Sequence, residues 1–167
     1  ISELLTPCRS LMSLGGKRWR PLLQVLCAMM VAEAKGKNDD IFENPGVKES
    51  FALTPLVEFV HTASLIHDDI EDGADTRRGK PAAHITYGLD TALNAGVWLY
   101  FLAPTAIDSL NLSADKKCLY YSMFTMELRR LHLGQAMDIF WHRNPDIFPQ
   151  IEEYQAMVQN KTGTLSC

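Results

Sequence analysis

Residues 68–72, with the sequence DDIED, place four carboxylates within five positions, and a pair of arginines follows them closely. On a helix, Asp68 and Asp72 would lie one turn apart on the same face, with Asp69 at its flank. Carboxylates are hard oxygen ligands of the kind that Mg²⁺ prefers, and Mg²⁺ often shares its remaining positions with substrate phosphates. Acidic side chains at the C-terminal end of a helix also oppose the helix dipole, so a cation there would offset that cost. The spacing therefore predicts a magnesium site at Asp68 and Asp72.

A solvated acidic helix end is the plainer interpretation of such a cluster, and the acidic residues alone leave it open. A calcium-binding loop of the EF-hand type is excluded by spacing. Counted from Asp68, its third position would be Ile70 and its twelfth Gly79, neither of which offers a side-chain oxygen.

Two basic clusters could bind the anion that accompanies such a metal. In GGKRWRP, residues 15–21, two glycines precede three cations just before an expected helix start. Helix N-terminal amides and the helix dipole add to side-chain charge there. In TRRGKP, residues 76–81, further cations follow the acidic run. An isolated basic patch is more often a solvated surface. Cations beside an aspartate pair, without an i,i+4 pairing scheme, favour a bridging anion and metal over simple salt bridges.

His61 precedes Asp68 by seven residues, which is two turns along the same helical face. A lone histidine is usually a core or surface residue. We expect His61 to bind a ligand because it shares its face with Ser64 and Asp68, whereas His67 should point elsewhere.

The elements that must position these residues are predicted to be helices. Apolar stretches, proline and glycine positions and caps indicate helices at 21–36, 51–72, 89–110 (interrupted at Pro104), 113–142 and from 151 onwards. Residues 37–49 are predicted to form a surface loop, and Pro55 to lie in the opening turn of its helix. Alternating β patterns and internal repeats are absent from the sequence. The predicted fold is an all-α bundle with long helices.

Composition narrows the class of protein. The 167 residues suffice for one domain with a hydrophobic core, and 47% of them are hydrophobic. The net charge of −4 argues against broad nucleic-acid binding. No apolar run reaches the roughly 18 residues of a transmembrane segment, and no signal peptide is evident. The cysteines are scattered, which predicts free thiols in a reducing cytoplasm rather than a zinc site or disulfides. They are Cys8, Cys27, Cys118 and Cys167.

Taken together, the motifs resemble those of the trans-type polyprenyl diphosphate synthases, the isoprenoid chain-elongating family that includes farnesyl and geranylgeranyl diphosphate synthases. The resemblance rests on GGKRWRP, HTASLIHDDIEDGADTRRGKPAAH, GQAMD and KTG, which occur in the family's order. It implies an isoprenoid-synthase-type helical bundle around a central cavity, and a magnesium-dependent homodimer. The implied reaction condenses isopentenyl diphosphate with an allylic diphosphate.

The resemblance also assigns residues. Asp68, Asp69 and Asp72 resemble the first aspartate-rich motif, in which Asp68 and Asp72 would hold Mg²⁺ on the allylic diphosphate. Contacts to that diphosphate are implied for Arg77, Gln135, Lys161 and Thr162. Binding of isopentenyl diphosphate is implied for Lys17, Arg20, His61 and Arg78. Asp68, Asp69, Asp72, Arg77 and Lys161 would be the catalytic set.

Residues 1–167 are expected to be a single polyprenyl synthase domain, truncated at both ends. A second aspartate-rich motif of the family would fall beyond Cys167, so the fragment alone is expected to be inactive. A non-catalytic, regulatory subunit remains the alternative, although its fold would have no use for such costly charges. An incidental helical bundle and a terpene cyclase are disfavoured by the ordered motifs and by the second anion site. Small residues at Ala63 and Ser64 predict a product longer than the farnesyl chain, with a geranylgeranyl or somewhat longer one expected.

Overall fold

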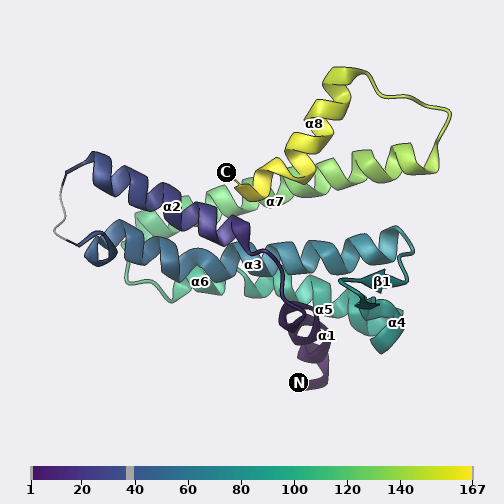
Figure 1. Cartoon of the computed structure of the whole chain (residues 1–167), viewed down its shortest axis with the longest axis horizontal. Coiled ribbons are helices and arrows are strands. Elements are labelled where there is room, and N and C mark those ends of the chain that lie inside the picture. Colours follow the sequence, from purple (N-terminus) through teal and green to yellow (C-terminus); the bar gives the residue numbers. More distant parts are fainter. Residues whose placement is uncertain (1, 37–39, 167) are drawn as a thin grey trace. The chain divides into compact units, whose positions relative to one another are not determined.

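The structure, a computed structural model, describes residues 2–36 and 40–166 and has the predicted all-α fold class. It comprises two compact units, residues 1–111 and 112–167, which are described separately below (Figure 1). In the first unit the elements are α1 (Ser2–Ser13), α2 (Trp19–Ala34), the 3-10 turn η1 (Ile41–Glu43), α3 (Pro45–Glu71), β1 (Thr76–Arg77), β2 (Lys80–Pro81), α4 (Ala83–Tyr87), α5 (Leu89–Leu102) and α6 (Thr105–Asp108). The second unit holds α7 (Ala114–Arg143), α8 (Ile151–Lys161) and η2 (Gly163–Ser166).

The helix that carries the acidic run begins earlier than predicted. The loop expected at 37–49 is wrong over its described part, because η1 and the first turns of α3 occupy it; residues 37–39 lie outside the described residues. Asn44 caps α3, since its Oδ1 accepts hydrogen bonds from the amides of Gly46 at 2.9 Å and Val47 at 3.4 Å. Pro45 then occupies the first helical position, where its missing N–H costs nothing. The Asn-Pro-Gly sequence is therefore a helix start rather than a turn.

Pro55 lies inside α3 and not in its opening turn, which corrects a second expectation. Proline lacks the N–H that would bind the carbonyl four residues earlier, here that of Phe51. The Thr54 hydroxyl donates to that carbonyl at 2.8 Å. The helix therefore continues through Pro55 with a substitute donor, and one rigid element carries His61 and the aspartates.

α3 packs against α2 and α5 (Figure 1). Its buried face includes Val60, Ala63 and Ile66, and α5 contributes Ala92 and Leu99. Gly96 of α5 lets the helices approach closely, because a Cβ there would lie 2.6 Å from Nε2 of His67. The same Nε2 lies 3.3 Å from the Leu93 carbonyl oxygen. His67 thus faces α5, which the sequence had not specified beyond the expectation that His67 would point elsewhere than His61.

Besides η1 and the short α4, two further elements of the first unit were not predicted. One is α1, which contacts α3, α4 and α5 and buries Cys8 and Leu11. The other is the short antiparallel hairpin of β1 and β2, in which Arg77 pairs with Lys80 across a two-residue turn. It follows α3 directly and returns the basic cluster toward the acidic end of that helix.

In the second unit α8 packs against α7. α7 begins as predicted, because the Ser113 hydroxyl oxygen accepts a hydrogen bond from the Lys116 amide at 3.3 Å. The start of α8 is fixed by a capping box, in which the backbone N–H of Gln150 donates to Oε2 of Glu153 at 2.8 Å. Leu131 and Gly134 of α7 and Met157 of α8 are buried.

The structure tests some of the remaining expectations. In the described part of the chain, Cys8, Cys27 and Cys118 are free thiols, and Cys167 lies outside it. No helix there is both long enough and apolar enough to cross a membrane. The central cavity and the single domain spanning both units stay predictions.

Candidate functional site

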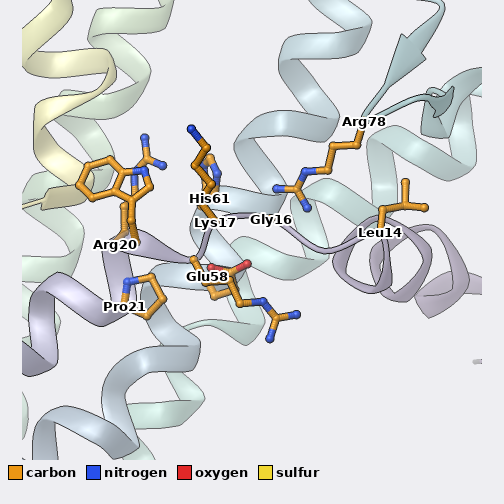
Figure 2. A pocket seen from close by; sticks show the side chains of 10 residues that line it. Leu14, Gly16, Lys17, Arg20, Pro21, Glu58, His61 and Arg78 are labelled. Carbon is orange, nitrogen blue, oxygen red and sulfur yellow. The ribbon is translucent and has the colours of Figure 1, made fainter.

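A pocket of about 390 Å³ in the first unit brings together residues far apart in the sequence. Lys17, Arg20, His61 and Arg78, which the sequence predicted to share a ligand, all line it. In the view of Figure 2, Arg20 and Arg78 lie on opposite sides of Lys17 and His61. Arg18 is a fourth cation of the lining, and Glu58 is its one carboxylate. Excess positive charge makes the pocket suited to a multiply charged anion.

Four different parts of the chain deliver these side chains. The segment between α1 and α2 supplies Lys17, just before the first turn of α2, which carries Arg20. α3 supplies His61. The hairpin supplies Arg78, whose φ of 52° and that of Gly79, 75°, are left-handed, as a tight two-residue turn requires. A short turn that fixes the backbone in this way also fixes the direction of the Arg78 side chain.

Burial and charge control the protonation of the pocket. The pKa of His61 is lowered to about 4, first by burial and then by the arginines Arg20, Arg78 and Arg77. His61 is therefore neutral at pH 7 and offers one N–H donor. Burial also lowers the pKa of Arg20, against the opposing effect of Glu58.

The Arg20 side chain carries a donor that is ready for a ligand. Its Nε is buried and has no hydrogen-bond partner among the described residues, while its guanidinium carbon lies 4.6 Å from the centroid of the Trp19 ring. Because an unmet buried donor costs free energy, an anion that reached it would gain that hydrogen bond at no loss of another partner in the protein.

The acidic end of α3 contains carboxylates of two kinds. Asp69 is 1% exposed and accepts hydrogen bonds from Arg77, from Nε at 2.7 Å and also from Nη2. Arg77 Nη2 also lies 3.2 Å from Asp68 Oδ2. These contacts correct the expectation that the neighbouring cations form no simple salt bridges. The pKa of Arg77 is raised, chiefly by its hydrogen bond to Asp69.

The remaining two aspartates fit a magnesium ion. Asp68 is partly exposed and Asp72 is exposed at the last turn and cap of α3, four residues apart. Two hard carboxylates that leave the other positions to water and phosphate suit Mg²⁺. Among the described residues no cluster of three or more His, Cys, Asp or Glu side chains could hold a metal by itself. Any ion here would therefore depend on these two carboxylates together with oxygens from outside the cluster.

The other predicted residues, Gln135, Lys161 and Thr162, lie in the second unit. Lys161 ends α8, and its Nζ lies 2.5 Å from Oδ2 of Asp138 on α7. Gly134, one turn before Asp138, lets the backbone of α8 approach, because a Cβ there would lie 2.2 Å from the Lys161 amide nitrogen. Gly134 and Asp138 thus fix the place of Lys161.

Sequence reasoning missed several of these residues. Trp19 and Glu58 line the pocket, although only their neighbours were predicted to bind. Arg18 also lines it; the sequence placed Arg18 in the basic cluster GGKRWRP but assigned it no ligand of its own. A usable signal existed for Glu58, which lies three residues before His61 and so on the same helical face. Trp19 could have been found only from the turn that precedes α2.

Comparisons with known proteins now bear on the site. The sequence pattern of the polyprenyl synthetase family matches residues 1–167. A geranylgeranyl pyrophosphate synthase of Macrophomina phaseolina (strain MS6) is 46% identical over 110 residues, which are 66% of this chain and 32% of that protein. A geranylgeranyl pyrophosphate synthase of Dictyostelium discoideum is 40% identical over 129 residues, 77% of this chain and 41% of that protein.

A solved structure is similar over almost the whole chain. The geranylgeranyl pyrophosphate synthetase of the archaeon Geoglobus acetivorans superimposes with a TM-score of 0.83 at 29% identity, over 98% of this chain and 49% of that one. The chain therefore spans less than half the length of each of these three proteins. Since the family pattern covers the chain from end to end, the chain belongs to the polyprenyl synthetase family.

Proposed function

We propose that the full-length protein is a magnesium-dependent trans-prenyltransferase that condenses isopentenyl diphosphate with an allylic diphosphate. The observation that supports this most is the pocket of the first unit, because the four residues expected to bind isopentenyl diphosphate line it together. The family membership and the names of the relatives agree with this reaction class. A cytoplasmic location stays a prediction.

The pocket residues would bind and orient isopentenyl diphosphate. Lys17, Arg20 and Arg78 supply charge-assisted donors to its diphosphate oxygens. Neutral His61 adds a donor without adding charge, and the bound anion would in turn raise the pKa of His61. The pocket thereby leaves the hydrocarbon end of the substrate, with its reactive double bond, to point toward the second substrate.

The acidic end of α3 would serve the allylic diphosphate. Asp68 and Asp72 would hold magnesium, which when bound offsets charge on a departing diphosphate. Arg77 would keep the buried Asp69 paired while it presents its other donors to the diphosphate. The family resemblance assigns Lys161, Thr162 and Gln135 to contacts with the same diphosphate. Together these side chains stabilise the leaving diphosphate as the allylic C–O bond breaks.

The remaining steps make and break bonds on the substrates. The double bond of isopentenyl diphosphate attacks the allylic cation and forms the new C–C bond. A proton then leaves the adduct for the departed diphosphate, so no protein base is required. The apolar walls of the cavity would exclude water that could otherwise capture the cation.

A geranylgeranyl-length or somewhat longer product is proposed. Ala63 and Ser64, at the fifth and fourth positions before Asp68, have small side chains, so no aromatic ring closes the chain-elongation tunnel there. The relatives from Macrophomina phaseolina and Dictyostelium discoideum are both geranylgeranyl pyrophosphate synthases, which supports the same length.

We also propose that the protein is a homodimer that associates through α5. Leu89, Leu93, Val97 and Phe101 recur at every fourth position along this helix, and each is at least 39% exposed. An exposed apolar stripe of this kind marks an association surface. Phe101→Glu should reduce the mass seen by analytical ultracentrifugation to that of a monomer. Met30→Glu, which places the same charge at an exposed position of α2, should leave the mass unchanged.

Steady-state kinetics of the full-length protein tests the two substrate sites. Lys17→Ala and Arg20→Ala should raise KM for isopentenyl diphosphate, whereas Arg77→Ala and Lys161→Ala should act on the allylic substrate. Each lost charge-assisted contact is worth about 1.5–3 kcal/mol, or roughly ten- to a hundredfold in KM. Equal shifts of both constants in all four variants would overturn the assignment of two sites. Binding of both substrates without turnover would favour the non-catalytic subunit.

A further inference from the structure

Two arginines of the pocket have a backbone conformation that side chains disfavour. Within residues 2–36 and 40–166, left-handed φ angles at non-glycine residues occur at Arg18, 45°, and Arg78, 52°. Both residues line the same pocket. Such conformations persist where the surrounding structure holds them in place, and they concentrate at functional sites. The two-residue hairpin turn accounts for the conformation of Arg78, whereas that of Arg18 calls for a further cause.

Their guanidinium groups meet at the C-terminal end of α1. Arg18 Nη2 donates to the Met12 carbonyl oxygen at 3.3 Å. Arg78 Nη1 donates to the Leu11 carbonyl oxygen at 3.3 Å and also to that of Gly15. The Met12 carbonyl also accepts a hydrogen bond from the Gly15 amide at 3.4 Å, and the carbonyls of this last turn carry the negative end of the helix dipole. Two cations that arrive from different elements thus cap the end of α1.

The turn at Gly15 and Gly16, which follows α1, leaves room for the Arg78 guanidinium. A Cβ on Gly16 would lie 2.9 Å from Arg78 Nη2, so the guanidinium rests where a side chain would otherwise stand. Leu14, from the same turn, forms part of the pocket wall. Lys17 follows this turn directly, and in Figure 2 the Arg78 guanidinium is directed from the hairpin toward Gly16.

We infer that Arg18 is a positioning residue for the anion pocket. Together with Arg78 it fastens the last turn of α1, and so fixes the turn at Gly15 and Gly16 from which Lys17 projects into the pocket. Arg18 acts through this turn, whereas Lys17 acts on the ligand itself. The part of this inference that concerns isopentenyl diphosphate rests on the proposed function.

Arg18→Gly in the full-length protein separates the two roles. Glycine accepts the left-handed backbone without strain, so the variant removes the guanidinium and leaves the turn conformation accessible. Amide hydrogen exchange of residues 10–17 should accelerate about tenfold or more as the end of α1 loosens. KM for isopentenyl diphosphate should rise about tenfold, because a displaced Lys17 would lose its charge-assisted contact to the ligand. The kcat should change less than about twofold.

Two variants provide the comparison. Arg9→Gln removes an exposed positive charge from α1 itself and should change neither measurement. Lys17→Ala should raise KM with little change in exchange, because it removes a ligand contact and not the cap.

Each outcome decides the inference. Unchanged exchange in Arg18→Gly overturns the cap, and a raised KM beside it would make Arg18 a direct ligand contact. Faster exchange with an unchanged KM overturns the link from α1 to the pocket, provided that Lys17→Ala raises KM. If the wild-type protein does not use isopentenyl diphosphate, the proposed function fails. The link is then judged by calorimetric titration with inorganic diphosphate, whose affinity Arg18→Gly should weaken about tenfold if the inference holds.

Discussion

Arg77 holds the buried carboxylate of Asp69 through hydrogen bonds from Nε, at 2.7 Å, and from Nη2. This contact divides the acidic run into parts with different tasks. Arg77 belongs to the hairpin that follows α3, and its ion pair with Asp69 anchors the hairpin to the end of that helix. Asp68 and Asp72 remain on the accessible side of the helix end, where a metal could reach them. The DDIED sequence thus combines a structural ion pair with the proposed magnesium ligands.

Asp69→Ala should therefore damage the fold more than Asp72→Ala does. Removal of the buried carboxylate leaves Arg77 with only its longer contact to Asp68, at 3.2 Å, and we expect a loss of about 3 kcal/mol in the free energy of unfolding. Asp72→Ala should change that free energy by less than about 0.5 kcal/mol, yet lower turnover by orders of magnitude at saturating Mg²⁺. Urea denaturation and turnover assays check both. Asp75→Ala, at an exposed carboxylate just beyond, should affect neither. Equal stability losses at Asp69 and Asp72 would contradict the division of tasks.

Gly134→Ala should displace the end of α8. The new Cβ would lie 2.2 Å from the Lys161 amide nitrogen, so the helices must separate, at a cost of about 1–3 kcal/mol in stability. KM for the allylic diphosphate should rise as well, because Lys161 moves with its backbone. Gly163→Ala is the matched control for stability, since its Cβ would meet Gln159 Cγ at an ordinary 3.6 Å. Similar unfolding midpoints for the two variants would show that the contact between α7 and α8 can accommodate the added methyl group.

His61 should make the protein sensitive to acid. Its pKa in the folded chain is about 4, below the ordinary value of 6.5, so the unfolded chain binds the proton first as the pH falls. Its stabilising effect is complete above pH 6.5 and is lost as the pH falls toward 4. Acidification from pH 7.5 to 5 should cost about 2 kcal/mol through this residue. His61→Gln, which cannot ionise, should show a smaller loss in urea denaturation at the two pH values. The same loss in both proteins would exclude His61 as its source.

Product length should respond to the size of the side chain at position 64. Ser64 is a better position for this test than Ala63. Ala63 is fully buried, so Ala63→Tyr would overpack the core and reduce the yield of folded protein. Ser64 is partly exposed, and its hydroxyl donates to the His61 carbonyl at 2.8 Å. Ser64→Tyr should shorten the product, because a ring there would occupy the volume of the growing chain. Chromatography of the dephosphorylated products measures this. A product of unchanged length from a well-folded Ser64→Tyr protein would mean that the tunnel ends elsewhere.

The sequence predicted the helices well where periodicity and caps were strong. Ser113 and the break at Pro104 are examples, because each acts within a few neighbouring residues. It failed at Asn44, whose capping hydrogen bonds could equally have formed in a turn, and at Pro55, where the Thr54 hydroxyl bonds the Phe51 carbonyl and lets the helix continue. Asn44 was predicted to lie in a loop, although Asn before Pro is also a strong signal for a helix start.

The pocket lining was predicted in its main residues but not in its organisation. Lys17, Arg20, His61 and Arg78 were grouped through a resemblance, and the structure brings them to one pocket. The ion pair of Arg77 with Asp69 and the cap on α1 were beyond reach, because each joins segments through a turn whose geometry no local pattern fixes. The left-handed φ angle of Arg18 has no local sequence signature, whereas that of Arg78 belongs to the two-residue hairpin turn that it forms with Gly79.

Incorporation of radiolabelled isopentenyl diphosphate by the full-length protein tests the central claim most directly. The assay is run with several allylic primers, with saturating Mg²⁺ or with a chelator, and with Lys17→Ala beside the wild-type protein. We expect label in chain-elongated product only when both an allylic primer and Mg²⁺ are present, with a raised KM for isopentenyl diphosphate in Lys17→Ala. Absence of elongated product with every primer at saturating Mg²⁺, or equal incorporation in the presence of chelator, would contradict the proposed function.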